Sequence, residues 1–308
     1  MGNSPSKPLR GIKNDPNAPP SLRFTRKRQM VIPVAYGKRK EYLCFPTAHS
    51  YELFKARGKK FSTPENMQDE DLGVPLFEFK NLGPLERFGS SENERYLISK
   101  FVCQSISQPP PYFESIVVCQ SETHIIYKSP FCTVIKAFKT SRCSYDFIFY
   151  TPNEMPPLRL VQHCSSVGLD TRLGDWDVSW RRTGKEDYEL LVLLPPEESA
   201  TIPGNHPNHN LFEPNAPVWA QYIDAEESFS HSMSGKFAVL NIGETDLESD
   251  STAYGIASIP WFSLVIACMA LVQCHRIQEY RHRSRGPGRR YYNATPLMGI
   301  TNAGYGYY

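Results

Sequence analysis

Four basic residues stand out within the otherwise acidic middle of the chain. No acidic residue lies between Glu122 and Asp146, although residues 61–275 carry 28 Asp/Glu against 14 Lys/Arg. If neighbouring strands gather the four side chains, their ammonium and guanidinium groups form a patch that attracts phosphate. The alternative is an ordinary solvated surface. The predicted phosphate-binding patch consists of Lys128, Lys136, Lys139 and Arg142.

A proline run in the same half of the chain has the pattern of a peptide ligand. Residues 109–112 read Pro-Pro-Pro-Tyr, which matches the P-P-x-Y pattern that WW domains bind as a preformed polyproline helix. The pattern predicts that Pro109, Pro110 and Tyr112 bind a WW-domain protein, for example a ubiquitin ligase. A simple turn between two strands is the alternative.

The amino terminus combines a lipidation pattern with a basic segment. The chain opens Met-Gly-Asn-Ser-Pro-Ser, which predicts myristoylation at Gly2. Because one myristoyl chain binds membranes only marginally, stable attachment needs a second signal such as a basic segment. Residues 1–60 provide it with 14 Lys/Arg against 3 Asp/Glu. The predicted membrane-binding residues are Arg23, Arg26, Lys27, Arg28, Lys38, Arg39 and Lys40.

Residues that could do catalysis or bind metals are sparse. The sequence has no nucleophile elbow, zinc-protease motif, Walker A loop or dinucleotide fingerprint, so it indicates no catalytic residue and no cofactor and favours a non-enzymatic protein. A catalytic triad assembled from distant residues is the alternative. His206 and His209 lack the further ligands of a zinc site. Asp246, Glu248 and Asp250 lack the Gly and Glu of a calcium loop. Eight cysteines without C-x-x-C spacing indicate buried free thiols in a reducing compartment.

One long apolar stretch, residues 253–272, decides how these residues are positioned. Its length suits either a membrane span or a core helix. The basic tail after it predicts a cytosolic carboxyl end, and myristoylation predicts a cytosolic amino end. A single span cannot place both ends on one side. We therefore predict a helix near residues 260–276 that is apolar all round because protein encloses it, with a single membrane span as the alternative.

Short β-type runs separated by turn residues fill the chain before this helix. In residues 175–181, for example, Trp176, Val178 and Trp180 alternate with polar residues, as in a half-buried strand. A short helix is expected at residues 50–57. About twelve strands are predicted at residues 30–36, 41–46, 95–106, 114–120, 123–128, 131–138, 145–150, 158–164, 175–181, 187–194, 217–223 and 236–242.

Many strands followed by one apolar helix resemble the tubby C-terminal-like superfamily, which includes tubby, LURP-one-related and phospholipid scramblase proteins. The resemblance rests on the order of elements over roughly residues 30–278. It implies an all-β fold in which a closed, about twelve-stranded barrel encloses a carboxyl-terminal helix. It also implies that the barrel holds phosphoinositide headgroups, for which the phosphate-binding patch of Lys128, Lys136, Lys139 and Arg142 is the candidate site. The expected organisation is a disordered basic, lipidated arm (1–29), the barrel (30–278) and a disordered basic and aromatic tail (279–308).

Together these features predict a non-enzymatic lipid-binding or adaptor protein at the cytoplasmic face of a membrane. Its expected partners are anionic membrane lipids and a WW-domain protein, and no nucleic acid, since most of the body is acidic. The alternatives are a single-pass membrane protein and a scramblase-like lipid-handling protein.

Overall fold

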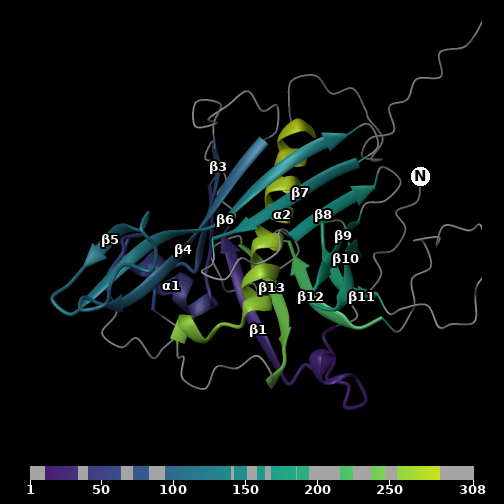
Figure 1. Cartoon of the computed structure of the whole chain (residues 1–308), viewed down its shortest axis with the longest axis horizontal. Coiled ribbons are helices and arrows are strands. Elements are labelled where there is room, and N and C mark those ends of the chain that lie inside the picture. Colours follow the sequence, from purple (N-terminus) through teal and green to yellow (C-terminus); the bar gives the residue numbers. More distant parts are fainter. Residues whose placement is uncertain are drawn as a thin grey trace, which may run out of the picture.

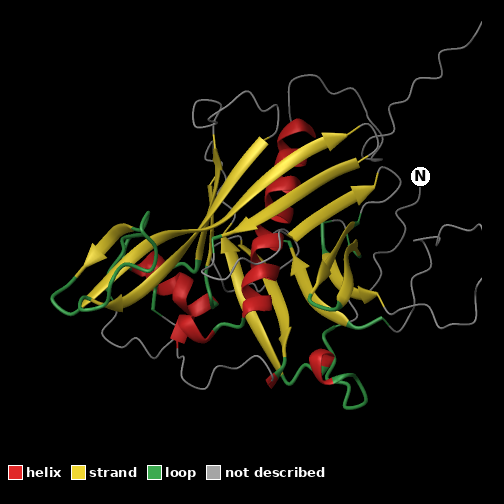
Figure 2. Ribbon diagram, viewed as in Figure 1, coloured by secondary structure: helices red, strands yellow, loops and turns green. Residues whose placement is uncertain are grey.

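The computed structural model shows an antiparallel sheet that curls almost completely around one long helix, α2 (Figures 1 and 2). The structure describes residues 11–33, 41–63, 72–82, 94–139, 142–150, 158–163, 168–184, 186–193, 216–224, 237–246 and 255–284.

Thirteen strands lie within the described residues, and every pairing between them is antiparallel. Their order around the sheet is β1-β13-β12-β11-β10-β9-β8-β7-β6-β4-β3-β2, while β5 pairs with β6 at the side. The strands are β1 (Arg26–Pro33), β2 (Glu41–Cys44), β3 (Phe77–Leu82), β4 (Glu94–Ser105), β5 (Ile116–Gln120), β6 (His124–Lys139), β7 (Arg142–Phe149), β8 (Leu158–His163), β9 (Leu169–Leu173), β10 (Trp176–Arg182), β11 (Tyr188–Leu193), β12 (Val218–Ile223) and β13 (Phe237–Glu244).

The two ends of this sheet, β1 and β2, meet at a single point. Val31 and Phe45 exchange both backbone hydrogen bonds, at 3.1 and 2.8 Å. The barrel is therefore nearly closed, with a seam on either side of this bridge.

Helix α2 (Trp261–Ser284) fills the barrel, as predicted. Side chains from Leu264 to Cys274 are buried on every face of the helix, which explains why the sequence is apolar all round. The helix is long and apolar enough to cross a bilayer, yet 83% of its most apolar stretch is buried in the protein. The predicted fold class, an all-β barrel around a carboxyl-terminal helix, is confirmed.

The fold begins and ends outside the predicted limits of residues 30 and 278. β1 starts at Arg26, and the preceding segment with the 3-10 turn η1 (Pro20–Leu22) packs onto the barrel. Phe24 is buried and its ring lies 5.9 Å from that of Trp219. It fits there because Gly243 has no side chain: a Cβ would lie 2.6 Å from the Phe24 ring. Assigning all of residues 1–29 to a disordered arm was therefore wrong, and α2 continues to Ser284.

The predicted short helix is confirmed, whereas three other local features differ from the prediction. The expected short helix is present as α1 (Ala48–Ala56), and a 3-10 turn, η4 (Gly255–Ser258), precedes α2. β3 and β9 were not predicted. Two strands were predicted on either side of Pro130, but they form the single strand β6. Pro130, which lacks an N–H group, fits within this strand because it pairs where the register with β4 shifts, between Ile98 and Ser99. The paired strands β4, β5 and β6 extend from the barrel as an arm (Figure 1).

Candidate functional site

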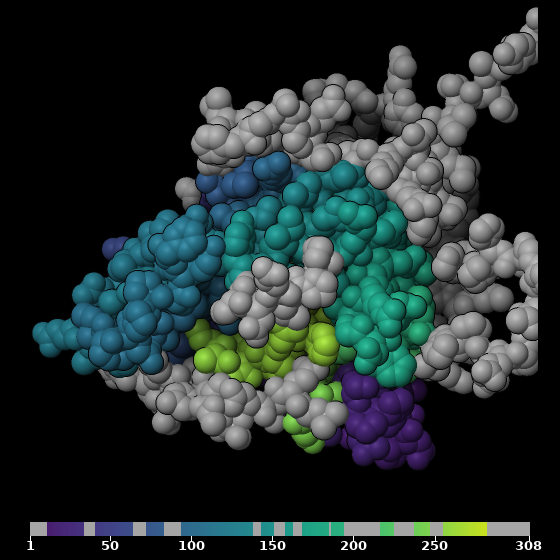
Figure 3. All heavy atoms as spheres, viewed as in Figure 1, coloured from purple at the N-terminus to yellow at the C-terminus, as the bar shows by residue number. Residues whose placement is uncertain are grey.

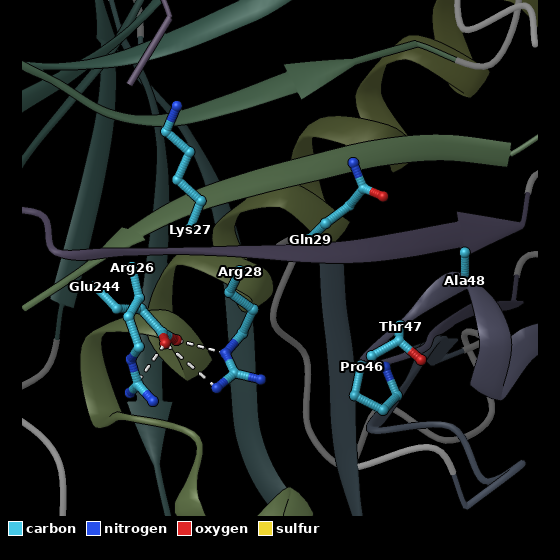
Figure 4. Close-up of a pocket in the computed structure, with 8 residues that line it drawn as sticks. All are labelled: Arg26, Lys27, Arg28, Gln29, Pro46, Thr47, Ala48 and Glu244. Atoms are coloured by element: carbon cyan, nitrogen blue, oxygen red, sulfur yellow. Dashed lines mark hydrogen bonds and ion pairs between the residues drawn. The ribbon is translucent and has the colours of Figure 1, made fainter. Parts of the chain in front are cut away.

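An open pocket of about 360 Å³ lies where β1 passes the amino-terminal end of α1 (Figure 4). Three consecutive basic residues contribute to it, and all three were predicted to bind membranes. Its lining residues are Arg26, Lys27, Arg28, Gln29, Pro46, Thr47, Ala48 and Glu244.

The pocket exists because the chain leaves the edge of β1 after Phe45. The antiparallel bridge between Val31 and Phe45 would place Thr47 opposite Gln29 if β2 continued. Thr47 instead caps α1, and its side chain accepts a hydrogen bond from Ser50 N at 3.0 Å. The edge of β1 before Gln29 therefore faces a helix terminus, whose N–H groups carry partial positive charge.

The three basic side chains lie on two sides of β1. Arg26 and Arg28 point toward Glu244, while Lys27 points away from it (Figure 4). Arg28 Nε lies 2.5 Å from Glu244 Oε1, and Arg26 NH2 lies 3.4 Å from Oε2. The exposed fraction of the side chain is 7% for Arg28 but 51% for Arg26. Arg28 is therefore a structural ion pair, whereas Arg26 and the exposed Lys27 are accessible to a ligand.

Glu244 connects the pocket to the interior of the barrel. Only 2% of its side chain is exposed, and it accepts a hydrogen bond from Ser263 Oγ of α2 at 2.7 Å. One buried carboxylate thus joins β1, β13 and the first turn of α2.

Of the remaining predicted membrane-binding residues, the structure describes Arg23, which does not line this pocket. Arg23 is exposed and donates to the carbonyl oxygen of Ala18 at 3.4 Å. Gly2 and residues 38–40 (Lys38, Arg39 and Lys40) lie outside the described residues.

The predicted phosphoinositide residues are not gathered into one exposed patch by the described part of the chain. Lys128 Nζ lies 2.8 Å from Glu78 Oε2. Lys136 is buried, with Nζ 2.8 Å from Glu94 Oε2 and 3.3 Å from Glu279 Oε2. The backbones of Lys139 and Arg142 pair where β6 turns into β7, but their side chains lie outside the described residues. Lys136 therefore forms ion pairs within the barrel and is not exposed to a ligand.

Around Lys136 the barrel encloses a polar cluster that the sequence analysis missed. His275 Nε2 lies 3.4 Å from Glu279 Oε1, and His275 Nδ1 lies 3.4 Å from Tyr42 Oη. Contact with His275, together with Lys136, lowers the pKa of Glu279 to about 2 despite its partial burial. The available signal was the appearance of Gln273, His275 and Gln278 within an otherwise apolar helix, since buried polar groups need partners.

The predicted WW ligand lies on the extended arm. Pro109, Pro110 and Pro111 are exposed, and Tyr112 is half-buried, with its ring 4.5 Å from that of Phe113. The Gln104 side chain donates to the Pro109 carbonyl at 2.6 Å, and Tyr112 N donates to Ser115 Oγ at 3.1 Å. The motif is therefore held at both ends, with its prolines toward solvent.

Metal ligands and activated nucleophiles do not gather in the described part of the chain. It contains no group of three His, Cys, Asp or Glu side chains that could hold a metal. Asp246 accepts a hydrogen bond from Thr25 Oγ1 at 2.7 Å, whereas His206, His209, Glu248 and Asp250 lie outside the described residues. Burial raises the pKa of the Cys103 thiol to about 11 and that of Cys274 to about 12, which disfavours the reactive thiolate.

Comparison with known proteins links the chain to fungal relatives. A family model described as DIA1 matches residues 25–284, nearly the span from the start of β1 to the end of α2. Protein DIA1 of Saccharomyces cerevisiae is 25% identical over 293 residues, covering 89% of this chain and 85% of the relative. The uncharacterized protein YNL165W of the same yeast is 27% identical over 307 residues, covering 87% and 74%. No solved structure matches the chain.

Proposed function

The chain belongs to the DIA1 family, and we propose that it is a non-enzymatic, membrane-associated barrel that binds anionic lipid headgroups through the pocket beside β1. Myristoylation at Gly2 provides the first attachment. The tubby-like barrel suggested by the sequence remains part of this proposal.

The observation that carries the proposal is the joint position of Arg26, Lys27 and the amino-terminal end of α1 in one open pocket. A phosphate group there would meet the exposed guanidinium of Arg26 near the first turn of α1, while Lys27, on the other side of β1, adds attraction to the same anionic surface. Arg28 adds no further accessible charge because Glu244 neutralises it.

The position of the pocket in the chain suits a second membrane signal. Arg26, the first residue of β1, lies only 24 positions after Gly2 in the sequence, so a lipid on Gly2 and the pocket are close along the chain. Each basic residue near an anionic surface contributes about 1 kcal/mol of attraction, which supplements the marginal affinity of one acyl chain.

Cosedimentation of the full chain with liposomes tests this proposal. Lys27→Glu should lower binding to vesicles that contain phosphatidylserine or a phosphoinositide, and added salt should weaken binding further. Lys60→Glu is the matched control, because it makes the same charge change at an exposed lysine beyond the other end of α1. Equal binding by Lys27→Glu and the unmodified chain would contradict headgroup binding at this pocket.

A specific observation also favours an adaptor function. The exposed prolines of residues 109–111 present the P-P-x-Y pattern at the surface of the arm. Titration of the full chain with an isolated WW domain should give binding that Tyr112→Ala abolishes and Phe113→Ala retains. If Tyr112→Ala bound the WW domain as well as Phe113→Ala does, this segment would not be a WW ligand.

A further inference from the structure

A second pocket opens at the amino-terminal end of α2, separate from the pocket in Figure 4. Its volume is about 480 Å³. The start of α2, yellow-green in Figure 3, reaches the surface beneath teal strands. Six apolar residues and four others line the pocket. The apolar ones are Phe149, Leu158, Leu173, Trp261, Phe262 and Val265, and the others are Arg159, Thr171, Arg172 and Gly174.

The pocket forms because β8 and β9 share only one ladder pair. Val161 pairs with Asp170, and a regular continuation would place Leu158 opposite Leu173. That continuation is absent, so the wall opens at this end and uncovers the first turns of α2. Gly174, with φ +57°, makes the following turn, and a Cβ there would lie 3.1 Å from the Phe262 ring.

The rim of the pocket is cationic while its floor is apolar. Arg172 is exposed and donates from Nε to the Gly174 carbonyl at 3.3 Å. No carboxylate of the described residues forms an ion pair with Arg172, whereas Asp146 binds both Nε and NH2 of Arg159, at 2.5 and 2.9 Å. Helix α2 adds partial positive charge, since its first hydrogen bond runs from Leu264 N to Pro260 O and leaves earlier N–H groups without helical partners.

We propose that this pocket binds the alkyl chain of an anionic amphiphile, with the carboxylate or phosphate head against Arg172. Apolar lining with a few convergent polar groups and a volume between roughly 300 and 1,000 Å³ is typical of small-ligand sites. The half-buried rings of Trp261 and Phe262 give the chain an apolar surface to cover. This site shares no residue with the pocket beside β1, so the two proposals stand independently.

Trp261 provides a direct readout, because a bromine atom in contact with an indole quenches its fluorescence. Dibromostearic acid, added to the full chain below its micellar concentration, should quench the emission saturably. Trp261→Phe keeps an aromatic ring in the pocket and should remove the saturable part. Trp176→Phe is the matched control, because Trp176 is also half-buried but does not line the pocket. Saturable quenching that persists in Trp261→Phe would overturn the proposal.

The charged rim is tested with a second pair of ligands and variants. Arg172→Gln should weaken binding of dibromostearic acid roughly tenfold, the value of one charge-assisted hydrogen bond, and leave its uncharged methyl ester unaffected. Arg23→Gln is the control, since Arg23 also donates to a backbone carbonyl. Displacement by stearate or by a lysophosphatidic acid distinguishes a carboxylate head from a phosphate head. Equal affinity of acid and ester would overturn the role of Arg172.

A third pair of variants introduces a carboxylate inside and outside the pocket, and so distinguishes loss of the binding site from a general loss of structure. Leu158→Asp places a carboxylate in the pocket and should abolish saturable quenching. Leu97→Asp introduces the same change at a half-buried leucine of β4, outside the pocket, and should retain it. Retained binding by Leu158→Asp would contradict an alkyl-chain site.

Discussion

Two strands of this protein that its sequence marks as basic, β1 and β6, have opposite roles in the structure. In β1, Arg26 and Lys27 remain accessible at the rim of an open pocket. In β6, Lys136 is buried and lies within 3.3 Å of both Glu94 and Glu279. The difference comes from acids supplied by distant segments. Within the described residues, β4 and α2 supply Glu94 and Glu279 to Lys136 alone, while Arg26 and Arg28 of β1 share Glu244 of β13.

The comparison shows that a run of basic residues predicts a binding surface only if the fold leaves its charges unsatisfied. A buried ammonium group needs carboxylate partners, because an isolated buried charge costs several kcal/mol. Lys136 therefore stabilises the barrel, whereas the exposed Lys27 contributes little to its stability. The following substitutions test this division of roles.

Lys136→Met should produce the largest loss of stability. It leaves two partly buried carboxylates without their shared cation, and we expect the free energy of unfolding to fall by about 3 kcal/mol. Lys27→Met should change it by less than about 0.5 kcal/mol, as at other exposed positions. Urea denaturation of both variants provides the comparison, and similar losses would remove the distinction between the two strands.

Arg28→Met should have an intermediate effect within β1 itself. Glu244 would lose its closest partner but keep Arg26 and Ser263, so we expect a loss of about 2 kcal/mol. A double-mutant cycle with Glu244→Gln should give a coupling energy above about 1 kcal/mol. A coupling near zero would mean that Arg28, like Lys27, is available to a ligand.

The barrel and its helix were predictable because their signals are local. The alternation of Trp176, Val178 and Trp180 indicated a strand, and Val178 and Trp180 are indeed fully buried. The apolar residues 253–272 indicated an enclosed helix. β3 and β9 were missed because both are short. In β3 only Phe77 and Phe79 alternate with charged residues, and in β9 the three residues between Leu169 and Leu173 are polar, so pairing within the sheet decides their conformation.

The site was less predictable because its geometry depends on distant contacts. Arg26, Lys27 and Arg28 were expected to bind membranes, but Arg28 and its partner Glu244 are separated by 216 residues. The pocket itself depends on the departure of the chain from the β1 edge at Thr47, which no residue pattern near β1 indicates. In the same way, burial of Lys136 follows from Glu279, 143 residues further along the chain.

The polar cluster beside Lys136 should make stability depend on acidic pH. Contact with His275, followed by Lys136, lowers the pKa of Glu279 from 4.5 to about 2. A carboxyl with a lowered folded-state pKa contributes stability above the unfolded pKa, and this contribution is lost as pH falls from about 4.5 toward 2. Glu279→Gln should therefore reduce the pH dependence of Tm in that window. An unchanged profile would exclude Glu279 as its source.

Lys128→Ala should cause the smallest loss of stability. It tests a basic residue whose exposure is intermediate between that of Lys27 and that of Lys136. Lys128 forms an ion pair with Glu78, as Lys136 does with its partners, but its side chain is 30% exposed rather than 4%. Solvent screens such a pair, so its loss should cost about 0.5 kcal/mol. Added salt should reduce that cost further, whereas the cost of Lys136→Met should respond little, because buried pairs are weakly screened. Thermal unfolding at low and high ionic strength measures both. If salt affected the two variants equally, burial would not be what separates β6 from the accessible charges of β1.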